Sequence, residues 1–258
     1  MKIRSMILAT VAAVSFAGAA NAAQVAALVG NDTIAVVDTD KKAVTKTMKV
    51  TGISGAILGI DVRPADGMLY GVIDDGSVVT IAMDGKATKK STLDTMLAKG
   101  TVATIDFNPV ADRLRVMGAD GTSLRANVDD GKVTKDGSHK YAETDMHKGE
   151  KPNVIAGAYT NSVKGTKETA LFNIDGTIGA LVKQAPPNDG VLSAVGKLGM
   201  KADTVAFDIW SDGTKNDAWL MSGGTLYSVD LATGKATEAA KITGVSGTVK
   251  DIAILPAM

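Results

Sequence analysis

The sequence repeats one short pattern, and this repetition constrains the fold more than any other feature. GIDVRP at 59–64 and TIDFNP at 104–109 share the order small residue, hydrophobic residue, aspartate, hydrophobic residue, any residue, proline. A hydrophobic run follows each segment after a turn. Self-similarity with a period of about 20–50 residues is typical of proteins that repeat one small structural unit. The number of units, and the way they close, therefore decide the fold.

Five such units follow one another along the chain. Each unit predicts three strands joined by two tight turns, because hydrophobic runs alternate with dipeptides that adopt positive φ easily. These dipeptides include Asp75-Gly76, Asp120-Gly121, Asp130-Gly131 and Gly223-Gly224. A further apolar strand precedes four of the units, as ILGIDV, VATIDF, NVIAGAY and DTVAFDI. The first unit lacks one, but TVKDIAIL at the C-terminus has the same pattern and no unit follows it.

This arrangement predicts an all-β fold, namely a five-bladed β-propeller of four-stranded blades closed by pairing of the N- and C-terminal strands. Such closure removes exposed sheet edges that would otherwise invite aggregation. The alternative is a sandwich or barrel of about eight to ten strands built from similar hairpins. Helix should be nearly absent, and 91–100 is the stretch best suited to a helical turn or two.

The first 22 residues predict a signal peptide. Lys2 and Arg4 precede a run of apolar and small residues, and Ala20-Asn21-Ala22 fits the small residues expected before cleavage at Ala23. The run is short for a membrane span, and an uncleaved anchor is the alternative. We therefore expect a signal peptide at 1–22 and a single propeller domain at 23–258, located in the periplasm or secreted.

Composition narrows the classes of partner. The chain has no cysteine, which excludes disulfides, thiolate nucleophiles, cysteine-ligated metals and a lipid-modified cysteine. Without the signal peptide, 26 basic side chains stand against 28 acidic ones, so electrostatics give no reason to expect nucleic acid or an anionic membrane as a partner. The mature chain has no long apolar segment, and we expect a soluble monomer without a transmembrane segment.

Motifs of several enzyme classes are absent from the sequence: a P-loop, a dinucleotide-binding glycine fingerprint, His-Glu-X-X-His and Gly-X-Ser-X-Gly. Aromatic residues make up 4% of the chain, which is low for a lectin that stacks sugar rings on Trp or Tyr. Trp210 and Trp219 flank one turn, and we expect them to pack rather than to bind a ligand.

Several longer motifs resemble a known bacterial family, the domain of unknown function 4394. The segments that carry the resemblance are GIDVRPADGMLYGV, TIDFNPVADRLRVMGADGTSLRANVDDG, NVIAGAYTNS, TALFNID, QAPPNDGVLSAVGKLG and DLATGKATE. The resemblance extends from about Val25 to Pro256, and its middle, from TIDFNP to SLRAN, is the most specific part. It implies an exported, propeller-like protein without an established activity.

Aligning the innermost strands gives the first candidate site. The alignment places one column of residues near the axis: Asp61, Asp106, Gly157, Asp208 and Asp251, with spacings of 45, 51, 51 and 43 residues. Four carboxylates that converge on the axis could hold Ca²⁺, which takes six to eight oxygen ligands. The alternative is structural: each aspartate accepts main-chain N–H groups and fixes one blade against the next.

Four arginines lie in two adjacent repeats and form a second candidate site: Arg63, Arg113, Arg115 and Arg125. Guanidinium groups bind carboxylates and phosphates with two parallel hydrogen bonds. We favour salt bridges between blades, with Asp61, Asp106 and Asp112 as partners. The alternative is a site for an anionic ligand.

Two loops are further candidates. The connection at 138–153 contains His139, His147, Glu143, Asp145 and Glu150, residue types that suit Zn²⁺ or Cu²⁺, although the spacing of the histidines matches no compact metal motif. The turn at 183–192 contains paired prolines and Asn188 and could wall a pocket. Gly157 replaces a column carboxylate close to Tyr159 and Asn161, so we expect a ligand pocket near the fourth blade.

These features favour a non-enzymatic, exported propeller that binds a small ligand, an ion or an envelope protein. The alternative is a metal-dependent hydrolase or lactonase-like enzyme that uses the axial carboxylates, because propellers host both kinds of function. A third reading is an envelope scaffold without a small-molecule site. The three differ in whether the column carboxylates are free at the axis or all satisfied internally.

Overall fold

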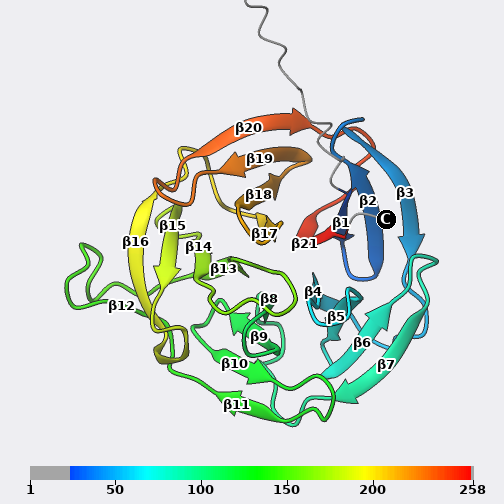
Figure 1. The fold of residues 1–258 in the computed structure, drawn as a ribbon, viewed down its shortest axis with the longest axis horizontal. Coiled ribbons are helices and arrows are strands. Elements are labelled where there is room, and N and C mark those ends of the chain that lie inside the picture. The colour runs from blue at the N-terminus through cyan, green and yellow to red at the C-terminus, as the bar shows by residue number, and fades with distance from the viewer. Residues whose placement is uncertain (1–23, 257–258) are drawn as a thin grey trace, which may run out of the picture.

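Strands form along the hydrophobic runs, and a computed structural model, which describes residues 24–256, arranges them as five sheets in a ring (Figure 1). Blade 1 consists of β21 (Val249–Leu255), β1 (Gln24–Val29), β2 (Thr33–Asp38) and β3 (Ala43–Lys49). Blade 2 consists of β4 (Ile57–Val62), β5 (Leu69–Ile73), β6 (Ser77–Ile81) and β7 (Ala87–Thr92). Each of these two sheets is given from the axis outward.

The other three blades follow the same order. Blade 3 consists of β8 (Ala103–Asn108), β9 (Arg113–Gly118), β10 (Ser123–Ala126) and β11 (Val133–Lys135). Blade 4 consists of β13 (Val154–Tyr159), β14 (Leu171–Asp175), β15 (Ala180–Gln184), β16 (Val191–Lys197) and β12 (Lys140–Tyr141). Blade 5 consists of β17 (Ala206–Ser211), β18 (Asn216–Ser222), β19 (Thr225–Val229) and β20 (Ala236–Lys241). The five-bladed β-propeller predicted from the repeats is thus confirmed.

The two ends of the described chain close the ring. Strand β1 pairs antiparallel with β21, with Gln24 opposite Leu255 and Ala26 opposite Ala253. Because β21 comes from the end of the chain and its three partners from the beginning, the composite blade cannot form until both ends are present. The predicted closure is confirmed.

Burial decreases from the axis to the rim, and the sequence follows this gradient. The strands between the innermost strand and the rim, such as β1, β2 and β14, are buried almost throughout. This burial explains their continuous apolar runs. The rim strands β3, β7 and β20 are mostly exposed and carry lysines. Charged residues on an exposed edge strand discourage pairing with other chains.

The hydrophobic core is divided among the junctions between neighbouring blades. Ile60 and Leu28 belong to the cluster between blades 1 and 2, and comparable clusters lie at the junctions 2/3, 4/5 and 5/1. The cluster between blades 3 and 4 is the smallest, and polar groups accompany it. Each blade is therefore held mainly by its two neighbours.

Two details differ from the predictions. Blade 4 has a fifth strand, because β12 from the 138–153 connection pairs parallel with β16. The stretch at 91–100 forms no helix: Ser91 and Thr92 end β7, and bends and turns follow. The helical segment of the described chain is a single 3₁₀ turn, Pro187–Asp189. The predicted signal peptide lies outside the described residues, and residues 24–256 contain no helix with the length and apolarity needed to span a membrane.

Candidate functional site

The innermost strands β4, β8, β13, β17 and β21 surround the axis (Figure 1). Each of them starts its blade, so their C-terminal ends meet at the same side of the ring. Asp61, Asp106 and Asp208 lie on β4, β8 and β17, one to three residues before these ends. We call these three residues the aspartate ring.

Each ring aspartate is bonded to the next blade. Phe107 N donates to Asp61 Oδ2 at 2.7 Å. Tyr159 N donates to Asp106 Oδ1 at 2.9 Å, and Ile254 N donates to Asp208 Oδ2 at 2.7 Å. These bonds join blade 2 to 3, blade 3 to 4 and blade 5 to 1. The structural role considered for the aspartates is therefore present in the molecule.

Asp251 lies in a different layer from the ring. Its Oδ2 accepts a hydrogen bond from Ile60 N at 3.0 Å. In the ring, each aspartate accepts from the residue that follows the corresponding position of the next blade, so Asp251 corresponds to Gly59. Gly59 lies two residues before Asp61. The residue of blade 1 that corresponds to Asp61 is Ala253, because the N–H of the next residue, Ile254, donates the bond to Asp208. The alignment of the innermost strands made from the sequence is therefore wrong for β21, which is shifted by two residues. Asp251 lies one layer below the aspartate ring.

The same correction applies to blade 4. Tyr159 N donates the bond to Asp106, so Ala158 holds the ring position and Gly157 does not. Gly157 does not leave space beside the axis either. A Cβ built on it would overlap Asn173 Oδ1 and lie 2.8 Å from Met117 Cε. The expectation that Gly157 opens a pocket was wrong, because neighbouring side chains already fill its surroundings.

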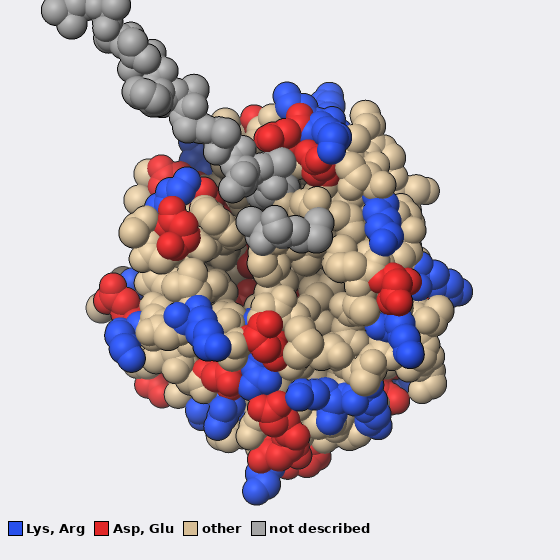
Figure 2. Space-filling view, turned by 45° about the vertical axis from the view of Figure 1, so that its right-hand side comes forward, with Lys and Arg blue, Asp and Glu red and all other residues tan. Residues whose placement is uncertain are grey.

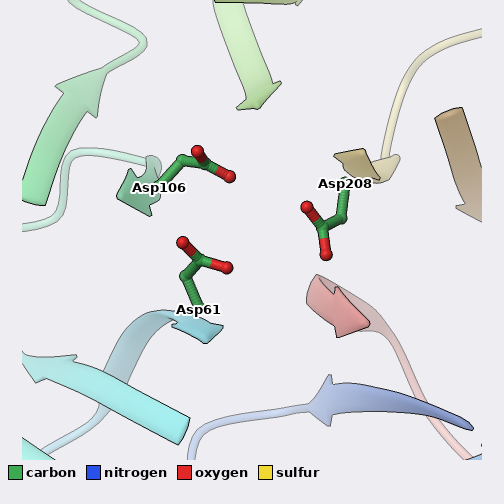
Figure 3. A group of neighbouring side chains, drawn as sticks. All are labelled: Asp61, Asp106 and Asp208. Carbon is green, nitrogen blue, oxygen red and sulfur yellow. The ribbon is translucent and has the colours of Figure 1, made fainter. Parts of the chain in front are cut away.

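The carboxyl groups of the ring face a common centre (Figure 3). Asp61, Asp106 and Asp208 each offer one oxygen, and these oxygens lie within 4.8 Å of one another. The three residues are 4%, 4% and 6% exposed. Alanines occupy the two remaining ring positions, which leaves the centre to the carboxyl groups.

This cluster is electrostatically unfavourable when all three groups are ionised. Burial raises the pKa of Asp61 and of Asp106 well above the usual range, and neighbouring carboxylates raise each further. Burial also raises the pKa of Asp208, to about 6. No lysine or arginine within residues 24–256 forms an ion pair with the ring. The charge of the ring is therefore not balanced by the described part of the protein.

A pocket opens directly above the ring. It has a volume of about 340 Å³, and Asp61 and Asp208 lie in its lining. The walls come from the C-terminal ends of the inner strands of blades 1, 2 and 5 and from the loop after β13 in blade 4. They include Val62, Pro64, Ser162, Lys164, Trp210 and Ile254.

The arginines fold into ion-pair networks instead of lining this pocket. Arg63 is buried and binds Asp112 through Nε and Nη2, at 2.8 and 2.7 Å. It also binds Asp129 through Nη1 and Nη2, at 3.2 and 2.8 Å. Both partners belong to blade 3, so this network joins blades 2 and 3. Asp112 was an expected partner, whereas Asp129 was not and Asp61 does not take part.

Arg115 and Arg125 share Asp136 as a partner. Arg115 is 0% exposed; its Nη1 lies 3.0 Å from Asp136 Oδ2, and Nε of Arg125 lies 2.7 Å from the same oxygen. Arg115 also donates to Ser123 Oγ, to Tyr159 Oη and to Asn188 Oδ1. Asp106, the expected partner, accepts none of these bonds, although it faces Arg115 across the β8–β9 pair.

The remaining candidate residues bond within one blade or between neighbouring blades. Arg113 donates to the carbonyls of Ala111 and Asp112 at the start of β9. Asn161 exchanges hydrogen bonds with Asn216 and so ties the loop after β13 to blade 5. Tyr159 and Asn188 bond to Arg115 as described. The structure therefore does not bring the proposed ligand-binding residues into one open pocket.

The two histidines are separated. His147 Nδ1 lies 3.1 Å from Glu150 Oε2 near the surface. His139 is 7% exposed, and neither ring nitrogen has a hydrogen-bond partner in the described structure. Burial, with a contribution from Arg115, lowers the pKa of His139 to about 4. Within residues 24–256 the histidines belong to no cluster of three metal-ligating side chains, so the 138–153 connection does not form the metal site considered for it.

Sequence reasoning missed the residues that wall the pocket. Trp210 packs at the junction of blades 5 and 1, as expected, but it also lines the pocket. Ser162 and Lys164 follow Tyr159 and Asn161 closely in the sequence, so the expected pocket near blade four was close to the correct segment. The signal that could have located it is the shared proline after three inner strands, Pro64, Pro109 and Pro256, which marks the strand ends at the mouth.

Acidic and basic side chains are mixed on the face of the molecule that Figure 2 shows. This agrees with the near balance of acidic and basic residues in the sequence.

The comparisons with known proteins identify a family. The sequence profile of a family described as "Domain of unknown function (DUF4394)" matches residues 33–253. No curated protein matches the chain.

Solved structures resemble the chain at low identity. A protein of unknown function from Bacteroides caccae is 12% identical, with 92% of this chain and 100% of that chain covered and a TM-score of 0.45. A structural genomics protein of unknown function from Bacteroides thetaiotaomicron VPI-5482 is 16% identical over 81% of this chain and 54% of that chain, with a TM-score of 0.49.

An auxiliary nutrient binding protein from Bacteroides ovatus ATCC 8483 is 12% identical, over 72% of this chain and 50% of that chain, with a TM-score of 0.47. This chain thus spans about half the length of the last two structures. Nothing about its function follows from these likenesses.

Proposed function

The chain belongs to the DUF4394 family, a family of unknown function, and from this premise we propose that it is an exported, non-enzymatic binding protein. Its aspartate ring holds a divalent cation, Ca²⁺, and the pocket above the ion takes a small ligand. The proposal places the protein in the periplasm or outside the cell, after cleavage before Ala23.

The observation that carries this proposal is the unbalanced charge of the ring. Three carboxyl groups lie within 4.8 Å of one another and are almost completely buried. Buried carboxylates need a counter-charge or must take up protons. A divalent cation would supply that charge, and carboxylate oxygens are the ligands that Ca²⁺ prefers.

The hydrogen bonds of the ring leave room for an ion. Asp61 and Asp208 each accept two main-chain N–H bonds, one per oxygen. A carboxylate has about four lone-pair sites, so these oxygens keep capacity for a metal. Asp106 accepts a main-chain bond only at Oδ1, and within the described residues its Oδ2 has no hydrogen-bond partner. The blade-joining role and ion binding are therefore compatible.

The pocket supports binding better than catalysis. Among the described residues that line it, the ionisable side chains are Asp61, Asp208 and Lys164. A metal-dependent hydrolase would need a further acid or base placed over the ion and its bound water. A scaffold without a site would not need to gather three carboxyl groups below an open pocket.

The test is a thermal melt of the chelated protein with and without added Ca²⁺, Mg²⁺ and Zn²⁺. At a free Ca²⁺ concentration of about 100 times Kd, binding stabilises the folded state by about 2.7 kcal/mol, which raises Tm by about 5–10 °C for a chain of this size. An unchanged Tm with every ion would contradict the proposal.

Two variants locate the ion. Asp106→Asn removes a ring carboxylate and should abolish the Ca²⁺ response. Asp251→Asn is the matched control, because Asp251 is equally buried and also accepts an N–H from the next blade, but lies outside the ring. A lost response in both variants, or in neither, would contradict the assignment to the ring.

A further inference from the structure

The size and the lining of the pocket above the aspartate ring indicate which kind of ligand it binds. Its volume of about 340 Å³ is at the lower end for sites that bind small molecules. The lower wall is formed by Asp61 and Asp208, and the side walls are mostly apolar. A ligand therefore meets the ion at one end and carbon surface along its sides.

The charge around the ion disfavours anionic ligands. Three ionised carboxylates carry more negative charge than one divalent cation neutralises, so the loaded ring has an excess charge of about −1. Ca²⁺ takes six to eight oxygens, and the positions left open favour neutral oxygens such as hydroxyls. Lys164 lies exposed at the rim, where its charge offsets this excess without an anionic ligand.

The walls offer a surface for a sugar-like ring. Trp210 is half-buried and lines the pocket, with Val62 and Ile254 among the other apolar lining groups. Lys215 Nζ lies over the ring, 5.6 Å from its centroid, so the opposite face of the ring is the one a ligand can use. Ser162 also lines the pocket, and within residues 24–256 its hydroxyl forms no hydrogen bond. An aromatic face, an open hydroxyl and a cation together suit a molecule that has a carbon face and several hydroxyl groups.

We propose that the pocket binds a neutral, hydroxyl-rich molecule of monosaccharide size, held by two adjacent hydroxyls on the ring-bound Ca²⁺ and by its carbon face on Trp210. This inference rests on the proposed function, because the ion supplies two of the contacts. The low aromatic content of the chain does not oppose it, since a bound ion replaces the set of stacked rings that metal-free sugar sites require.

Calorimetric titration of the Ca²⁺-loaded protein tests the inference. The probes are the neutral sugars mannose, galactose, fucose and ribose, with glucuronate and galacturonate as anionic counterparts. At least one neutral sugar should bind at concentrations below about 20 mM, and chelation of Ca²⁺ should weaken this binding by about tenfold or more. The anions should bind more weakly than that sugar.

Two tryptophan variants sharpen the test. Trp210→Leu should weaken sugar binding by about twofold to tenfold, since an aromatic contact contributes about 0.5–1.5 kcal/mol, and it should leave the Ca²⁺-induced Tm shift intact. Trp219→Leu is the matched control: Trp219 packs in the same cluster but lies outside the pocket lining, so sugar affinity should not change.

The two proposals fail in different ways. If Ca²⁺ raises Tm but none of the neutral sugars binds, or the uronates bind more tightly, the inference about the ligand is overturned and the ion site stands. If Ca²⁺ itself leaves Tm unchanged, the proposed function fails. Sugar binding that Trp210→Leu leaves unaffected would also overturn the inference, because the ligand would then lie elsewhere.

Discussion

The junction between blades 3 and 4 and the axis both contain buried charges, but the charges are balanced in different ways. Arg115 at the junction contacts Asp136 and three neutral acceptors, so its charge and its donors are satisfied within the chain. The aspartate ring gathers three like charges with no basic partner in the described residues. Buried charges that other residues of the chain neutralise indicate a structural role. Buried charges that the chain leaves unbalanced indicate a binding site for an ion or a ligand.

The largest effect should come from breaking the balanced junction. Arg115→Met leaves Tyr159 and Asn188 without their shared donor and removes one of the two arginines that bind Asp136. Because Arg125 still pairs with Asp136, the loss should be about 3 kcal/mol, the lower end for breaking a buried ion pair. Urea unfolding measures this loss. Arg113→Met on the same strand is the control, since Arg113 contacts only main-chain carbonyls, and it should cost less than about 1 kcal/mol. Equal losses for both variants would show that the network contributes little.

His139 offers a pH-dependent test of the same junction. Its pKa in the folded protein is lowered to about 4, so the folded state binds fewer protons than the unfolded state between that value and about 6.5. The stability contributed by neutral His139 is complete above about pH 6.5 and is lost as pH falls toward 4, on the order of 3 kcal/mol.

His139→Leu should therefore be nearly neutral at pH 7, because both ring nitrogens lack partners, and more stable than the natural protein at acid pH. The charged groups that act on His139 are Arg115, Asp120 and Asp175, and the variant leaves them in place. Urea unfolding at a series of pH values measures the difference between the two proteins. A difference independent of pH would contradict the lowered pKa.

Loss of a charge at the aspartate ring should raise the stability of the protein, whereas loss of Arg115 lowers it. In the chelated protein near pH 8, Asp106→Asn should raise stability by about 2 kcal/mol, because it removes one of three mutually repelling charges and its amide can donate to the other carboxylates. Unfolding in the presence of a chelator measures this gain. Destabilisation of the size expected for Arg115→Met would mean that the ring is balanced after all.

The smallest effect concerns the packing beside the axis. Gly157→Ala places a methyl group against Asn173 and Met117, and overpacking of this kind costs about 1–2 kcal/mol. Urea unfolding is again the measurement. An unchanged or more stable variant would restore the idea of open space at Gly157.

The repeated pattern predicted the blades and their closure because short sequence segments determine both. Hydrophobic alternation and turn dipeptides recur in each blade, and the apolar segment at the C-terminus supplies the strand missing from the first. Strand β12 was not foreseen, since only Lys140 and Tyr141 form it and the backbone of β16 determines the pairing.

The ring itself was only partly predictable. Asp61, Asp106 and Asp208 were identified, but Asp251 was included because its hydrophobic neighbours imitate theirs. The proline three residues after Asp61 and Asp106 also follows Ala253, and it would have given the correct register. The partners Asp129 and Asp136 lie on turns and strand ends whose positions depend on packing between blades, which no local pattern encodes.

The most direct measurement of the central claim is an anomalous difference map from crystals of the protein soaked in Mn²⁺ or Ca²⁺. The account predicts a peak between Asp61, Asp106 and Asp208, about 2.3–2.6 Å from the carboxylate oxygens for Ca²⁺. A map without a peak at the ring at saturating ion concentration would show that protons, not a cation, neutralise these groups, and would contradict the account.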